Sequence, residues 1–203
     1  MGKLREIGLR TRLAVGLALL ACALGVPATA AAAPPNDDFA GATPIPSLPY
    51  TNTVSSVETA TFESGDPYLY CRRGQVAGDN SVWYRYTTGP SVERLKLTTD
   101  SATTNYDSVI QVFAGSRNGA DMALGGCADD PSSSTGGDTA VVRAEPNTTY
   151  YIEVAAKATL GSPSTLKLDV AAAPVYQVTG GGDGAGSCVS NVCPTLRAAV
   201  AQS

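Results

Sequence analysis

The sequence predicts an all-β protein built as an antiparallel β-sandwich, and three observations support this prediction. Runs of β-branched and aromatic residues are short, and Gly, Pro, Asn, Asp and Ser bound them, which is typical of strands joined by turns. Apolar and polar residues alternate within the runs, as in strands with one face on a core. Between residues 40 and 178 no segment has the length and period of a helix. Several short strands of this kind favour two packed sheets.

The first 30 residues have the three parts of a secretory signal peptide. A basic stretch within residues 1–12 precedes an apolar run over residues 13–24, and Ala28-Thr29-Ala30 follows as an A-x-A exit. The apolar run is shorter than the about 20 residues that a membrane span needs. We expect cleavage after Ala30, with Ala32 as the alternative. The mature protein is then secreted and has no stable membrane span.

Charge limits the partners of the mature chain. Residues 1–30 hold four of the 14 Lys and Arg and one of the 18 Asp and Glu, which leaves 10 basic against 17 acidic residues, a net charge of −7. Such a chain repels phosphate backbones, so we expect no nucleic-acid partner. The remaining length of about 170 residues suits one domain with a tail.

The cysteines predict disulfides. Cys22 lies in the signal peptide, where Leu19-Leu20-Ala21 before it leaves a lipoprotein anchored at Cys22 as an alternative. An even number of cysteines in the exported part indicates disulfides rather than metal ligands. Four cysteines allow three pairings, and we favour the one that joins sequence neighbours, Cys188–Cys193, together with Cys71–Cys127. The longer bridge is worth roughly 3–4 kcal/mol in loop entropy.

The chain contains no histidine, which excludes Ser-His-Asp and Cys-His catalysis and His-rich zinc sites. A glycosidase needs two carboxylates about 5–10 Å apart, with Asp129-Asp130 or Glu153 as the first candidates. Among 17 acidic residues some pair always qualifies, so this signal carries little weight. The sequence therefore predicts that this chain is not an enzyme.

Seven strands are expected within a sandwich that spans residues 50–173, after an Ala/Pro-rich leader over 31–49. Alternation is clearest where Val82, Tyr84 and Tyr86 share one face and Trp83 and Arg85 the other. The expected strands cover residues 51–61, 80–88, 92–99, 107–114, 139–145, 149–157 and 164–172.

Two long loops and a tail complete the expected organisation. The loops at 62–79 and 115–138 are rich in Gly, Asp and Ser and carry Cys71 and Cys127, so a disulfide between them is physically reasonable. Residues 171–175 are expected to be a linker, and 175–179 a new strand. Residues 174–203 thus form a linker and a cap segment.

Six sequence motifs resemble a known bacterial family. The runs NDDFAGATPI, SVWYRYT, YDSVIQVFAGS, GGCADD, NTTYYIEVAA and STLKLDV, over residues 36–172, are similar to the bacterial pre-peptidase C-terminal-like domain. The resemblance implies a jelly-roll-like β-sandwich. Members of that family occur beside secreted peptidases and other extracellular modules and are generally non-catalytic.

The tail resembles a second element, the CSLREA-type motif. Cys193-Pro194-Thr195-Leu196-Arg197-Ala198-Ala199-Val200 matches its core, with Pro-Thr in place of the usual Ser or Thr and Ala198-Ala199 in place of an acidic-Ala pair. The motif typically precedes a right-handed parallel β-helix, whose open end would otherwise expose strand edges. We therefore expect a strand and a short helix here, in a chain that stands N-terminal to a β-helix in a longer parent protein.

Acidic residues at strand ends and in loops are candidate Ca²⁺ ligands, because calcium takes six to eight oxygen ligands. The resemblance places Asp37, Asp107 and the Asp129-Asp130 pair at matched positions. Asx-turn chemistry is the competing interpretation, because the spacing follows no known calcium loop. The candidate set is Asp37, Asp38, Asp107, Asp129 and Asp130.

Trp83 beside Arg85 is the candidate binding surface, if both side chains face outward. Core filling is the competing interpretation for Trp83 and the neighbouring tyrosines. Together these patterns predict a secreted, non-catalytic accessory or binding module whose partner is extracellular polysaccharide or protein. The alternatives are a calcium-dependent carbohydrate- or cell-wall-binding module and the N-terminal part of a secreted β-helix enzyme that degrades polysaccharide.

Overall fold

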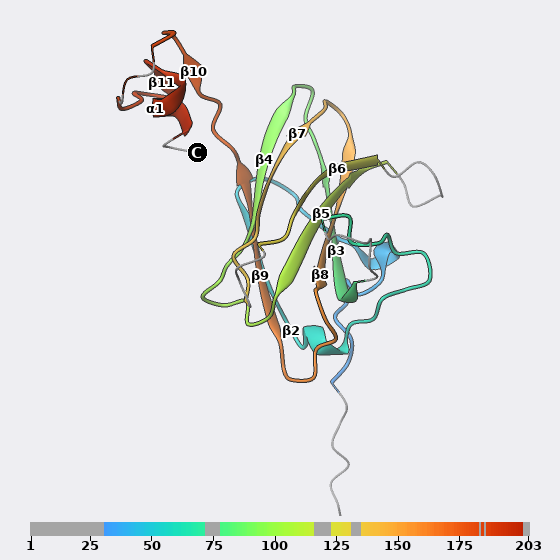
Figure 1. Ribbon diagram of the computed structural model, residues 1–203. Helices are drawn as coiled ribbons and strands as arrows, with labels where there is room; N and C mark the ends of the chain where they lie inside the picture. Colours follow the sequence, from blue (N-terminus) through green and yellow to red (C-terminus); the bar gives the residue numbers. More distant parts are fainter. Residues whose placement is uncertain are drawn as a thin grey trace, which may run out of the picture. The chain divides into compact units, whose positions relative to one another are not determined.

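The chain folds as an all-β protein, as the sequence predicts (Figure 1). The computed structural model describes residues 31–71, 78–115, 123–130, 135–182, 184 and 186–200. The predicted signal peptide, including Cys22, lies outside the described residues. The elements before residue 175 are η1 (Phe39–Gly41), β1 (Thr43–Pro44), β2 (Tyr50–Ser55), η2 (Val57–Thr59), β3 (Asp79–Thr87), β4 (Glu93–Thr99), β5 (Ser108–Ala114), β6 (Ala123–Ala128), β7 (Thr139–Ala144), β8 (Thr149–Ala156) and β9 (Thr165–Ala172).

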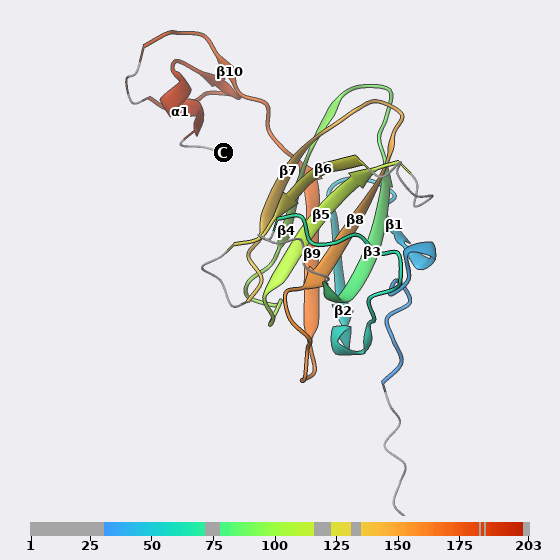
Figure 2. The ribbon, with the colours of Figure 1, turned by 45° about the vertical axis from the view of Figure 1, so that its right-hand side comes forward.

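Two sheets form the sandwich (Figure 2). The five-stranded sheet has the order β1-β3-β8-β5-β6, and the four-stranded sheet has the order β2-β9-β4-β7. Every pairing in them is antiparallel except that of β1 with β3, which is parallel. The predicted antiparallel sandwich is thus confirmed, with one parallel pairing at this edge, where a two-residue strand of the N-terminal segment joins β3.

The seven predicted strands correspond to β2, β3, β4, β5, β7, β8 and β9. The largest difference is in the first, which ends at Ser55 rather than at residue 61. Ser56 has a left-handed backbone with φ of 60°, and η2 begins directly after it. A residue in this conformation cannot continue the pleat of a strand.

Strand β6 lies inside the predicted loop 115–138 and depends on its glycines. A Cβ atom at Gly126 would lie 2.8 Å from Cγ2 of Val142, a buried residue of β7 in the other sheet. The missing side chain lets β6 come close to β7 and bring the two sheets together at this side of the sandwich. Gly-Gly within a strand weakens the sequence signal, which explains why β6 was not predicted.

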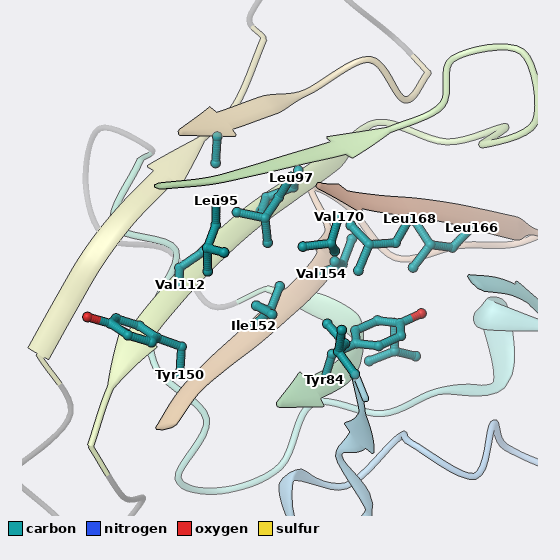
Figure 3. Packing of buried hydrophobic residues seen from close by; sticks show 14 of the residues in the cluster. Tyr84, Leu95, Leu97, Val112, Tyr150, Ile152, Val154, Leu166, Leu168 and Val170 are labelled. Carbon is teal, nitrogen blue, oxygen red and sulfur yellow. The ribbon is translucent and has the colours of Figure 1, made fainter. Parts of the chain in front are cut away.

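The core lies between the two sheets (Figure 3), and its buried strand residues come from the inward faces of β3, β4, β5, β7, β8 and β9. Tyr84 also crosses from one sheet to the other, where its hydroxyl donates a hydrogen bond of 3.0 Å to Oδ1 of Asn52. This closely packed layer positions the loops at both ends of the strands. Its fully buried members include Val82, Tyr84, Leu95, Leu97, Ile110, Val112, Ile152, Val154, Leu166, Leu168 and Val170.

The C-terminal segment has a small buried cluster of its own. Strand β10 (Gln177–Val178) pairs in parallel with β11 (Val192–Cys193), and α1 (Leu196–Val200) follows. Cys193, Ala198 and Ala199 are buried together, with Tyr176 and Cys188 packed against them. The strand at 175–179 and the short helix thus appear where the sequence predicts them. No helix in the described part of the chain is long and apolar enough to cross a membrane.

Candidate functional site

Two disulfides fix the segments that carry the candidate residues, with the pairing favoured from the sequence. Cys71 is bonded to Cys127 across 56 positions of sequence, with a Cα–Cα distance of 5.8 Å. Cys188 is bonded to Cys193 within the C-terminal segment. The longer bridge ties the loop that precedes β3 to strand β6 at the edge of the five-stranded sheet.

Asp107 and Asp129 share one cation, the ammonium group of Lys157. Its Nζ lies 3.3 Å from Oδ2 of Asp107 and 3.0 Å from Oδ1 of Asp129. The backbone N–H of Lys157 also donates to the Asp107 carbonyl at 3.0 Å. The hydrogen bond to Asp129 is the largest of the effects that raise the pKa of Lys157. The residue directly after β8 therefore places one positive charge between the two carboxylates that flank β5 and β6.

Asp138 organises the loop beside these residues, and the sequence interpretation missed it. Its buried carboxylate accepts hydrogen bonds from the Ser108 hydroxyl and, at 2.6 Å, from the backbone N–H of Asp130. Its own N–H donates to Oγ1 of Thr99 at 3.0 Å. Burial raises the pKa of Asp138, although the bonds from Ser108 and Asp130 oppose this. The signal that could have identified it is an Asp between Gly-Gly and a strand, a position suited to a loop-closing carboxylate.

Asp37 belongs to a separate group at the N-terminal segment. Its Oδ1 accepts the backbone N–H of Thr61 at 2.7 Å, and the Thr61 hydroxyl also donates to Glu63 at 2.5 Å. Burial raises the pKa of Asp37, with a further contribution from the nearby charge of Glu63. Asp38 is exposed and precedes η1 without a side-chain capping bond. Asp37 thus fastens the N-terminal segment to the loop that follows η2.

The structure places the predicted calcium ligands in separate groups. The hydrogen bonds place Asp37 with Thr61, whereas Asp107 and Asp129 meet at Lys157. Among the described residues, no three Asp, Glu, His or Cys side chains are grouped so that they could hold a metal ion. The five predicted ligands therefore do not come together in one cluster, and calcium binding stays a prediction.

Trp83 points away from the sandwich core, as the alternation predicts, but it is fully buried. Phe39 packs edge-on against it with ring centroids 5.1 Å apart, and the ring centroid of Phe113 lies 6.4 Å from that of Trp83. Asn36 holds this covering segment in place: its backbone carbonyl accepts the backbone N–H of Trp83 at 2.8 Å, and its Nδ2 donates to the backbone carbonyl of Trp83 at 3.1 Å. Trp83 is therefore not an exposed stacking surface, although its neighbour Arg85 is exposed.

Glu153, a first candidate for a catalytic carboxylate, is also fully buried on this face of the sheet. Its Oε2 accepts a hydrogen bond of 2.9 Å from Nε2 of Gln111, which is buried as well. A carboxylate that attacks or protonates a substrate must reach it. This arrangement gives Glu153 a structural partner in β5 instead.

No protein-family model matches the chain, and no curated protein matches it significantly. The resemblances to the pre-peptidase C-terminal-like domain and to the CSLREA-type motif therefore stay predictions. What the geometry provides is a disulfide-linked sandwich whose strand-end carboxylates are engaged in bonds within the fold.

Proposed function

We propose that the chain is a secreted, non-catalytic accessory module of a larger extracellular or cell-surface protein, and that it binds extracellular polysaccharide. One observation carries this proposal. The carboxylates that a hydrolase or a calcium-dependent lectin would use are bonded to groups of the fold itself: Asp107 and Asp129 to Lys157, Asp138 to Ser108 and Asp37 to Thr61. Carboxylates used in this way stabilise loops, and a rigid scaffold with stable loops suits binding.

Three further features support the proposal. The sequence has the pattern of a signal peptide, and two disulfides are compatible with an oxidising, extracellular environment. The resemblance to the pre-peptidase C-terminal-like domain implies a non-catalytic module in secreted proteins. The net charge of −7 in the mature chain disfavours anionic polymers and leaves neutral polysaccharide as the polymer best suited to it.

The C-terminal segment is proposed to pack against an adjoining β-helix. Its parallel pair has only two residues in each strand, whereas parallel sheets are normally larger and covered on both faces. Val178, Val189, Val192 and Leu196 of this segment are exposed. Apolar side chains around a short parallel pair are the features expected of a cap whose sheet continues into another element.

Co-sedimentation with insoluble polysaccharides tests the binding proposal. Purified protein comprising residues 31–203 is mixed with cellulose, chitin, insoluble xylan or cell-wall peptidoglycan, and the bound fraction is measured in the pellet. We expect saturable binding to at least one polymer, equal in EDTA and in millimolar Ca²⁺, because Asp37, Asp107 and Asp129 of the candidate calcium ligands are bonded to groups of the fold. Folded protein that stays in the supernatant with all four polymers would contradict the proposal. Binding that EDTA abolishes and Ca²⁺ restores would instead favour the calcium-dependent alternative.

A further inference from the structure

Two tyrosines are exposed on a segment that lies over the outer face of the five-stranded sheet. Tyr68 is 55% and Tyr70 43% exposed, whereas Leu69 between them is fully buried. Leu69 packs against Val109 of β5 and Ala155 of β8, and the segment crosses these strands in Figure 2. Because Leu69 faces the sheet, its two neighbours face solvent. The structure thus leaves two tyrosine side chains exposed, one on each side of a buried leucine.

The backbone that carries these rings is held at three successive residues. Leu69 is buried, the N–H of Tyr70 donates a hydrogen bond of 2.7 Å to Oε1 of Gln111, and Cys71 is bonded to Cys127. The Tyr70 ring also meets Phe113 edge-on, with centroids 6.4 Å apart. Binding of a ligand here therefore costs little conformational entropy of the protein backbone, which is the general advantage of a pre-organised site.

The small exposed area of Tyr68 and Tyr70 favours a carbohydrate ligand over a protein partner. A tyrosine presents about 150–250 Å², so two half-exposed rings offer about 200 Å², far less than the about 800 Å² per partner of a stable protein interface. An aromatic ring with a negative face attracts the partly positive C–H face of a sugar. A neutral glycan chain repeats such faces along its length and has no charge that the acidic protein would repel.

We propose that Tyr68 and Tyr70 form the glycan-binding surface of this protein, each stacking on a sugar ring of a neutral polysaccharide. This inference rests on the proposed function, since it assigns the polysaccharide binding to these two side chains. Leu69, Gln111 and the Cys71–Cys127 bridge act as positioning groups that hold the rings at the surface.

The test compares the following proteins, each comprising residues 31–203, in co-sedimentation with whichever of cellulose, chitin or insoluble xylan retains the parent. These are the parent, the double variant Tyr68→Ala/Tyr70→Ala, the double variant Tyr68→Phe/Tyr70→Phe, and Val141→Ser as a control. Val141 is 55% exposed on β7 of the other sheet. We expect the alanine pair to weaken binding at least about tenfold, which corresponds to about 1.4 kcal/mol, and the phenylalanine pair and the control to bind like the parent.

Melting curves show whether each variant is folded. Because loss of the Tyr70 ring could disturb its contact with Phe113, the single variant Tyr68→Ala is measured as well. That single variant is expected to weaken binding by a smaller factor. If the parent binds and the folded alanine variants bind equally well, the tyrosine site is wrong while the proposed function stands. If the phenylalanine pair loses binding, stacking is wrong as the mode of recognition. If the folded parent binds none of cellulose, chitin and insoluble xylan, the tyrosine site is wrong, and if it also stays in the supernatant with peptidoglycan, the polysaccharide function is wrong as well.

Discussion

Replacing Cys71 and Cys127 with serine together is expected to lower the free energy of unfolding of the sandwich by about 4 kcal/mol. The bridge spans 56 positions of sequence, so its loss returns the entropy of a long loop to the unfolded chain. It also removes the covalent link between the loop before β3 and the edge strand β6. The midpoint of urea unfolding, followed by the fluorescence of the single tryptophan, Trp83, measures the change.

The matched control is the pair Cys188→Ser and Cys193→Ser. That bridge spans only five positions, so its loss is expected to lower the free energy of unfolding of the C-terminal segment by about 2 kcal/mol in the same entropy model. Because the bridge lies within the buried cluster of that segment, its loss should leave the tryptophan fluorescence of the sandwich unchanged. A Cys71/Cys127 variant that unfolds at the same urea concentration as the parent would contradict the stabilising role of the long bridge.

Leu97→Ala is expected to destabilise the sandwich by about 2–5 kcal/mol, the usual cost of a leucine-sized cavity in a well-packed core. Leu97 is fully buried on β4, where it lies opposite Ala140 of β7 on one side and Val170 of β9 on the other. It points into the layer between the sheets (Figure 3). Neighbours fixed on two strands cannot collapse fully into the space that the side chain leaves.

Val141→Ala provides the control for this substitution. Val141 lies on the adjacent strand but faces solvent, so its truncation should change the free energy of unfolding by no more than about 0.5 kcal/mol. Thermal unfolding of both variants under the same conditions gives the comparison. Equal melting temperatures for Leu97→Ala and Val141→Ala would show that the space between the sheets is not a packed core.

The strands could be predicted wherever one face is apolar. Leu95 and Leu97 alternate with charged residues, and both lie in the core between the sheets. Strand β6 could not be predicted in the same way, because Gly125 and Gly126 give it no apolar face. Its place depends on the close approach to Val142 in another sheet, and such a long-range contact leaves no periodic signal in the local sequence.

The candidate site residues could also be predicted only as far as local sequence patterns allow. Alternation correctly separates Trp83 from the core face of β3, but it gives no information on the N-terminal segment that covers it through Asn36 and Phe39. Their position at strand ends and the family resemblance identify Asp107 and Asp129 as residues of interest, yet their partner Lys157 is distant in sequence from both. Side-chain chemistry could be predicted here, whereas accessibility and pairing depend on contacts that only the fold creates.

The measurement that most directly separates a binding module from an enzyme is the release of reducing ends from a polysaccharide that the protein binds. Protein comprising residues 31–203 is incubated with the polymer that retains it in co-sedimentation, and soluble and insoluble reducing ends are followed over time. A non-catalytic module, with its loop carboxylates engaged by Lys157, Ser108 and Thr61, predicts a bound protein and no reducing ends above the protein-free blank. A steady release of reducing ends that Asp129→Asn or Glu153→Gln abolishes in a folded variant would contradict it.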